Sequence, residues 1–289
     1  MADVTTRQVQ ANGLSFTVDE AGEGENVAIL LHGFPESRFS WRFQIPLLAE
    51  LGWRVIAPDL RGYGGSSRPR RKSDYHIDHL IDDVAALFDA VGARRRLLVG
   101  HDWGAIVAWS FAIDKRLPLD GLIIMNVPHP AVFARVIKTS PAQRKRSWYA
   151  AFFQLPLLPE MMMIRRKAQA TVDAFVNMAV DKSRFPPQVT DVYRDNALIP
   201  GAMTAMINYY RANGDLFGRH GGKPPVSEVP TLMVWGEEDT ALGVECTEGY
   251  EPYVKEFTLR RLPGVSHWVQ QEAPERVNDI VKQWLGEHP

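Results

Sequence analysis

The feature that most constrains this chain is an apolar run that ends in a glycine-bounded acidic turn. Residues 97–99 lead into Gly100-His101-Asp102-Trp103-Gly104, and an apolar, helix-like segment follows from Ala105. Glycine on both sides of the central residue suits a tight turn from strand to helix, where a Cβ would clash and the central φ is unfavourable. Such a nucleophile elbow presents Asp102 at the carboxyl end of the strand.

An aspartate at this position has its own chemistry. A carboxyl group with an ordinary pKa of about 3.9 is ionised near neutral pH, and the helix N-terminus behind it favours the negative charge. A carboxylate nucleophile attacks a saturated carbon and forms an ester that water later hydrolyses. The alternative is that Asp102 merely caps the following helix.

Composition limits the class of protein and its partners. The chain has 289 residues, 45% of them hydrophobic, and a net charge of −1, which fits a large globular α/β domain and indicates neither nucleic acid nor an anionic membrane as a partner. A single cysteine, Cys246, excludes an internal disulfide and favours a reduced compartment. Residues 1–13 lack an apolar signal core, and no apolar run approaches the ~20 residues that span a bilayer. We therefore expect a cytoplasmic protein without a membrane span.

Strand-like and helix-like segments alternate along the first part of the chain, which predicts a mostly parallel sheet flanked by helices. From residue 131 to 223 helical patterns and prolines replace the strands, which predicts a helical lid inserted between two parts of one core, 1–130 and 224–289. The expected strands are 14–19, 27–31, 53–57, 97–99, 122–127, 231–235 and 257–262. The expected core helices are 40–51 (with a break or kink at Pro46), 77–91, one from 105, and 274–285.

Two further polar residues follow strands late in the chain. Asp239 comes just after 231–235, and His267 comes just after 257–262. The carboxyl ends of parallel strands meet at one edge of a sheet, so we expect both side chains near Asp102. Nucleophile, acid and histidine in this order form a catalytic triad, in which Glu237 and Glu238 are the weaker candidates for the acid.

The turn after the first buried strand, His32-Gly33-Phe34-Pro35, is expected to complete the site. The backbone N–H of Phe34 and that of Trp103 would form an oxyanion hole. We expect His32 to make a structural hydrogen bond, and Glu36 is close enough in sequence to help position water.

These motifs resemble the epoxide hydrolases of the α/β-hydrolase superfamily over nearly the whole chain. The core motifs are His32-Gly33-Phe34-Pro35-Glu36-Ser37, Arg61-Gly62-Tyr63-Gly64-Gly65-Ser66 and Gly100-His101-Asp102-Trp103-Gly104, and the lid motifs are Tyr149 before Phe153-Gln154-Leu155-Pro156, and Asn208-Tyr209-Tyr210-Arg211. By this match the lid tyrosines are Tyr149 and Tyr210, with Tyr209 and the more distant Tyr193 as alternatives.

The resemblance implies hydrolysis of a small apolar epoxide by water, with no metal and no organic cofactor, in a monomer or homodimer. Opening an epoxide leaves an alkoxide, and a phenol that is still protonated at pH 7 can give it a proton. The residues implied to contact substrate are Phe34, Trp103, Phe153, Tyr209 and Trp268. Two alternatives stay open: a haloalkane dehalogenase, which shares the core motifs, and a non-catalytic binding protein on the same scaffold.

Overall fold

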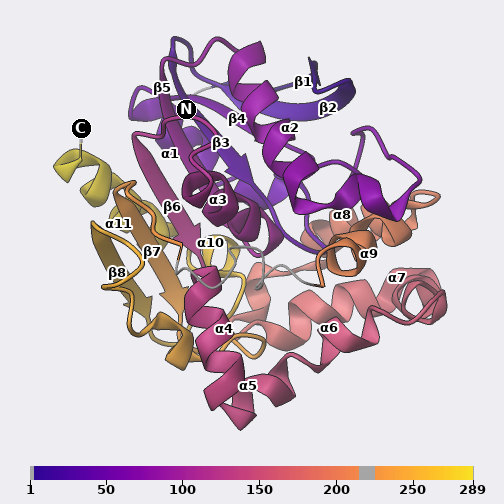
Figure 1. Ribbon diagram of the computed structural model, residues 1–289. Coiled ribbons are helices and arrows are strands. Elements are labelled where there is room, and N and C mark those ends of the chain that lie inside the picture. Colours follow the sequence, from indigo (N-terminus) through magenta and orange to yellow (C-terminus); the bar gives the residue numbers. More distant parts are fainter. Residues whose placement is uncertain (1–2, 215–224, 289) are drawn as a thin grey trace.

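The computed structural model describes residues 3–214 and 225–288 and is built on an eight-stranded sheet (Figure 1). The strand order is β1-β2-β4-β3-β5-β6-β7-β8. β1 pairs antiparallel with β2, and β2 pairs antiparallel with β4. The strands β3 to β8 all run parallel to one another. The strands are β1 (Thr5–Ala11), β2 (Leu14–Ala21), β3 (Asn26–Leu31), β4 (Arg54–Pro58), β5 (Arg95–His101), β6 (Gly121–Met125), β7 (Thr231–Gly236) and β8 (Phe257–Leu262).

Helices cover both faces of the sheet, which confirms the predicted α/β class. Side chains of β5 alternate between two cores, with Leu98 on one face and Leu97 and Val99 on the other. This is why the central strands read as continuous apolar runs. One face packs against α2 (Ile77–Ala90) and α3 (Trp103–Ile113), and the other packs against α1 (Gln44–Glu50), α10 (Val269–Glu272) and α11 (Pro274–Glu287).

The first strand differs from the prediction, which treated residues 1–13 only as polar. β1 is an edge strand in which only Val9 and Ala11 are buried, so its sequence carries little apolar pattern. Its partner β2 is joined to it through Asn12 and Gly13, both at positive φ. An Asn-Gly pair is the favoured two-residue hairpin turn, so this signal was present in the sequence.

The helix expected at 40–51 is divided. A short 3₁₀ turn, η1 (Arg38–Trp41), precedes α1. Pro46 lies in the first turn of α1, where its missing N–H costs no intrahelical hydrogen bond, so the expected break falls just before Pro46 rather than at it.

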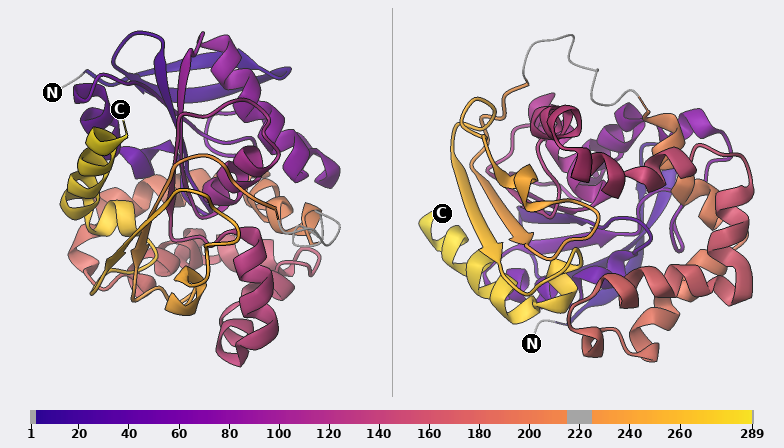
Figure 2. Two further views of the ribbon diagram at one scale, coloured as in Figure 1. Left: turned by 60° about the vertical axis from the view of Figure 1, so that its left-hand side comes forward. Right: turned by 90° about the horizontal axis from the view of Figure 1, so that it is seen from below.

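Among the described residues between β6 and β7, the named elements are all helical. They are α4 (Pro130–Thr139), α5 (Pro141–Arg146), α6 (Trp148–Phe152), α7 (Leu158–Met178), the 3₁₀ turn η3 (Lys182–Arg184), α8 (Pro187–Leu198) and α9 (Ala202–Ala212). α4 to α9 gather below the carboxyl ends of the strands, as Figures 1 and 2 show. The expected end of the lid at residue 223 lies outside the described residues. None of the helices that the structure describes is long and apolar enough to cross a membrane.

Candidate active site

Asp102 lies on a sharp turn between β5 and α3. Its φ and ψ are 47° and −122°, a conformation that an L-residue with a side chain rarely adopts. A Cβ on Gly100 would overlap the backbone of Gly104 and Ala105, and one on Gly104 would overlap the Leu31 carbonyl. The two glycines therefore allow the close packing that holds Asp102 in this strained position.

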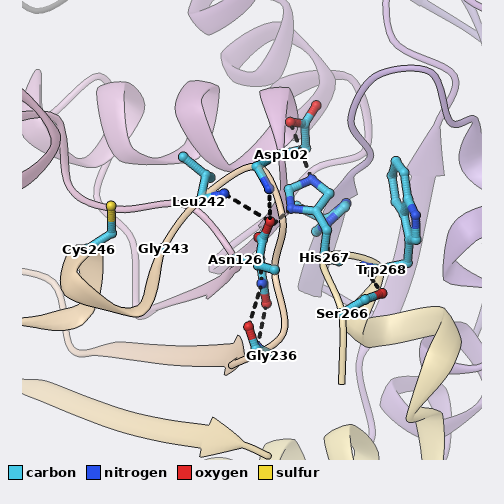
Figure 3. Close-up of polar contacts among 12 residues, drawn as sticks. Asp102, Asn126, Gly236, Leu242, Gly243, Cys246, Ser266, His267 and Trp268 are labelled. Atoms are coloured by element: carbon cyan, nitrogen blue, oxygen red, sulfur yellow. Dashed lines mark hydrogen bonds and ion pairs between the residues drawn. The ribbon is translucent and has the colours of Figure 1, made fainter. Parts of the chain in front are cut away.

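The structure brings Asp102, His267 and Asp239 together at the carboxyl ends of β5, β8 and β7. Figure 3 shows the ring of His267 beside Asp102. The Nδ1 atom of His267 is 2.6 Å from Oδ2 of Asp239. On the other side of the ring, Nε2 is 3.6 Å from Oδ2 of Asp102. The imidazole is thus fixed through one nitrogen and presents the other to Asp102.

Asp239 is held by four contacts, which distinguishes it from its acidic neighbours. Its Oδ1 accepts hydrogen bonds from the backbone N–H groups of Ala241 and Leu242, and its Oδ2 accepts one from Asn126 at 2.9 Å. Glu238 is exposed and Glu237 is half-buried, whereas the carboxylates that contact the His267 ring are those of Asp239 and Asp102. The sequence analysis missed Asn126, which follows β6 at positive φ.

The charges of the three groups support one another. Burial alone would raise the pKa of Asp102, but the hydrogen bond and charge of His267 outweigh it and hold the pKa of Asp102 below its usual value. For His267, burial would lower the pKa, but the carboxylates of Asp239 and Asp102 raise it to about 10. With Asp102 free, the resting state therefore pairs a carboxylate with an imidazolium.

The turn after β3 contributes a hydrogen bond to the nucleophile. The N–H of Phe34 donates to Oδ1 of Asp102 at 2.6 Å. His32 is fully buried, and its Nε2 accepts the N–H of Leu60 at 3.1 Å, which is the structural bond expected of it.

Glu36 is fully buried and does not line the cavities that Asp102 faces. Its Oε2 accepts the N–H of Gly33 and contacts Nδ1 of His101, each at 2.8 Å, and its Oε1 accepts the side-chain amides of Gln270 and Gln271. Because these bonds occupy both oxygens, the suggestion that Glu36 positions water is wrong.

Two largely apolar cavities meet at Asp102, with volumes of about 400 and 430 Å³. Asp102, Tyr149 and Tyr210 line both of them. Trp103 also lines the first, and Phe34, Phe153 and Trp268 also line the second.

The two lid tyrosines face each other across this junction. The ring centroids of Tyr149 and Tyr210 are 6.1 Å apart, and Tyr210 also packs edge-on against Trp103 and Phe34. Burial first, and then the nearby charge of Asp102, raise the pKa of both phenols. Both hydroxyls therefore stay protonated at neutral pH and can donate a hydrogen bond or a proton.

The other two tyrosines considered for this role are placed elsewhere. Tyr209 is fully buried and donates its hydroxyl to the carbonyl of Arg61 at 2.9 Å. Tyr193 is also buried and donates to Oε1 of Gln271 at 2.5 Å. Neither lines the two cavities at Asp102, so the expected substrate contact of Tyr209 is corrected.

Glu272, a second residue that was missed from the sequence, joins the loop after α7 to the loop that carries His267. Oε1 of Glu272 accepts the N–H groups of Val180 and Asp181, at 3.0 and 2.8 Å. Its Oε2 accepts both the N–H and the hydroxyl of Ser266, the residue before His267. One buried carboxylate therefore binds two segments that are distant in sequence.

Comparison with known proteins agrees with this geometry. Residues 26–274 match the family described as the alpha/beta hydrolase fold. Epoxide hydrolase 3 of Xenopus tropicalis is 36% identical over 97% of this chain and 77% of that protein. Epoxide hydrolase 4 of Mus musculus is 38% identical, over 97% and 79%. A crystal structure of a Bacillus megaterium epoxide hydrolase in complex with an inhibitor matches with a TM-score of 0.89 and 30% identity, covering 97% of this chain and 100% of that one. The chain therefore belongs to the alpha/beta hydrolase fold family and, within it, to the epoxide hydrolases.

Proposed function

We propose that this chain hydrolyses small apolar epoxides to vicinal diols through an ester on Asp102. In the first half-reaction a carboxylate oxygen of Asp102 attacks a ring carbon while the carbon–oxygen bond on that carbon breaks. The phenol of Tyr149 or Tyr210 gives its proton to the released oxygen. The product of this step is a hydroxyalkyl ester and a tyrosinate. The tyrosinate then takes the proton of the His267 imidazolium, which restores the phenol and leaves a neutral imidazole.

In the second half-reaction His267 takes a proton from water, and that water attacks the carboxyl carbon of Asp102. The N–H groups of Phe34 and Trp103 stabilise the oxyanion. The bond between the carboxyl carbon and the diol oxygen then breaks, and His267 returns its proton to the diol. The carboxyl group of Asp102 ionises again, and its proton returns to His267, so the net reaction consumes one epoxide and one water.

The observation that carries this proposal is the pair of protonated phenols at the junction where Asp102 is exposed to both cavities. A haloalkane dehalogenase expels halide and needs N–H groups that point at it rather than a proton donor. The side chain of Phe34, next to the carboxylate, has no such group. We further propose that residues 131–223 act as the lid over a core made of 1–130 and 224–289, in a cytoplasmic monomer or homodimer.

The test is turnover of styrene oxide by the native chain and by tyrosine variants. We expect diol formation by the native chain, and a loss of about 10²-fold or more when Tyr149 and Tyr210 are both changed to Phe, the lower range for a lost general acid. The matched control is Tyr209→Phe, whose hydroxyl is bonded to the backbone away from the cavities. Halide release from bromoalkanes that survives loss of both tyrosines, without any diol, would instead favour a dehalogenase.

A further inference from the structure

The outer surface of the lid carries a patch of exposed apolar side chains that is unusual for a soluble surface. Large apolar residues are normally exposed singly, whereas a cluster marks an interaction site. Here they concentrate in α6, in the turn that follows it and in the start of α7, two helices at the lower right of the molecule in Figure 1. The lid patch consists of Trp148 (64% exposed), Leu155 (45%), Leu157 (71%), Leu158 (42%), Met161 (58%), Met162 (52%) and Ile164 (41%).

The lid patch is held in place from beneath. Arg211, at the end of α9, donates from Nε to the carbonyl of Phe153 at 2.9 Å and from Nη2 to the carbonyl of Leu155. Its guanidinium also pairs with Glu160, with Nη1 2.5 Å from Oε1. Both side chains of this pair are largely buried. The exposed side chains are therefore displayed by an anchored turn rather than by a loose loop.

The chain segment that carries the lid patch is rich in basic residues, one of which, Arg146, pairs with Glu245. Residues 144–167 contain six Lys or Arg residues and one acidic residue, Glu160, which is buried and paired. Arg165, Arg166 and Lys167 follow the patch directly and are exposed. The chain as a whole has a net charge of −1, so this local concentration of positive charge does not show in the overall composition.

The lid patch is continuous with the second cavity. Trp148 and Met162 belong to the patch and also line that cavity, which reaches Asp102 and His267 at its inner end. Apolar side chains thus lead from the outer surface of the lid to the candidate nucleophile. A molecule bound against the patch would have an apolar path to the site.

We propose that the lid patch docks on the surface of a bilayer that contains anionic lipids. The apolar side chains enter the boundary between headgroups and acyl chains, while Arg165, Arg166 and Lys167 contact the phosphates. A second copy of the chain fits less well, because a two-fold contact through the same patch would bring like charges together. Docking itself does not depend on the reaction; only its benefit, delivery of membrane-dissolved epoxides, rests on the proposed function.

Trp148 gives a direct readout of this docking. Of the eight tryptophans, the other seven are at most 7% exposed. Vesicles of phosphatidylcholine and phosphatidylglycerol with brominated acyl chains should therefore quench the fluorescence of Trp148 alone. We expect quenching and co-flotation with these vesicles, a weaker effect at high salt, and little binding to phosphatidylcholine vesicles. The quenching should disappear in Trp148→Phe.

Two surface variants separate the apolar and electrostatic parts. Leu157→Ser with Met161→Gln removes exposed side chains outside the cavities, and Arg165→Gln, Arg166→Gln, Lys167→Gln removes the charge. Each should weaken vesicle binding at least tenfold and leave turnover of dissolved styrene oxide unchanged. The matched controls, Val4→Ser (47% exposed) and the exposed Arg260→Gln, Arg276→Gln, Lys282→Gln, should bind as the native chain does.

The proposal is overturned if native protein does not float with the anionic vesicles, or if the lid and control variants bind equally. A dimer in solution that dissociates in Leu157→Ser, Met161→Gln would show that the lid patch is a self-association surface instead. Binding is measured without turnover, so an inactive but vesicle-bound chain would contradict only the proposed function.

Discussion

At the scale of single residues, Asp102 and His267 each set the charge of the other. The Asp102 carboxylate contributes to the raised pKa of His267 and therefore favours the imidazolium before the reaction begins. Conversion of Asp102 into an ester removes that negative charge. The pKa of His267 must then fall, which makes the ring available as a base at the step that needs one.

This coupling predicts the behaviour of a variant that imitates the ester. Asp102→Asn keeps the shape of the side chain but not its charge, so the pKa of His267 should fall below the native value of about 10. The imidazole resonances followed by NMR against pH measure this shift, and His267→Gln identifies them. An unchanged pKa would show that Asp239 alone sets the charge of His267.

The same coupling sets the direction in which the stability of the folded protein changes with pH. The pKa of His267 is higher in the folded protein than in an unfolded chain, so its contribution to stability is complete below an unfolded pKa of about 6.5 and is lost as pH rises through about 10. Asp102→Asn should show a smaller loss of stability over this alkaline range in chemical denaturation. An equal loss in both proteins would mean that other groups account for it.

The sequence was enough to identify functional residues that follow strands, but not residues whose roles depend on tertiary contacts. Asp102, Asp239 and His267 each follow a strand, so the geometry of a parallel sheet was enough to bring them to one edge. Glu272 accepts hydrogen bonds from Val180 and Asp181, which precede it by 92 and 91 positions in the sequence. No local sequence pattern indicates partners at such a distance. Glu36 was placed near the site correctly, but three of its four hydrogen bonds depend on side chains from β5 and α10.

At the scale of elements, Glu272 couples the loop after α7 to the loop that carries His267. Glu272→Ala removes the hydrogen bonds to Val180, Asp181 and Ser266 at once. We expect a loss of stability of about 1–3 kcal/mol from the unpaired buried groups, and faster hydrogen exchange at Val180 and Asp181. Because His267 loses support, the second half-reaction should slow more than the first, so the ester accumulates.

The control for this prediction spans the same two parts of the chain. Glu275, at the start of α11, pairs with Arg184 at 3.0 Å, but its side chain is 68% exposed. Loss of such a surface pair in Glu275→Ala should cost about 0–1 kcal/mol and leave the balance of half-reactions unchanged. Equal behaviour of the two variants would reduce Glu272 to a general stabilising contact.

The elements themselves were predictable where their surroundings are simple. Strands buried on both faces read as apolar runs, and β3, β5 and β7 lie close to the expected ranges. β1 was missed because an edge strand needs few apolar residues. The lid helices were predicted only as a group. Their individual faces are decided by packing against the core and against one another, which helical periodicity alone does not specify.

At the scale of the whole molecule, the site consists of two cavities that meet at the carboxylate of Asp102. An epoxide with a bulky group on each carbon would place one group in each cavity, whereas styrene oxide needs only one of them. Ala174 lines the second cavity and not the first. Ala174→Phe should therefore raise KM or lower kcat/KM at least tenfold for trans-stilbene oxide, with a smaller effect on styrene oxide.

The control for this prediction is the exposed Ala142 of α5, which lines neither cavity. Ala142→Phe adds the same side chain outside the site and should leave both substrates unaffected. An equal loss for both epoxides in Ala174→Phe would indicate that substrate occupies the first cavity and enters through the second.

The covalent intermediate on Asp102 is the central claim, and a mass spectrum of His267→Gln protein after incubation with styrene oxide tests it most directly. Without the base, the second half-reaction should stop while the first continues. We expect a mass increase equal to one styrene oxide, located in the peptide that contains Asp102 and absent when Asp102→Asn is added. Diol formation by native protein, with no adduct on His267→Gln under any condition that keeps it folded, would contradict the ester mechanism.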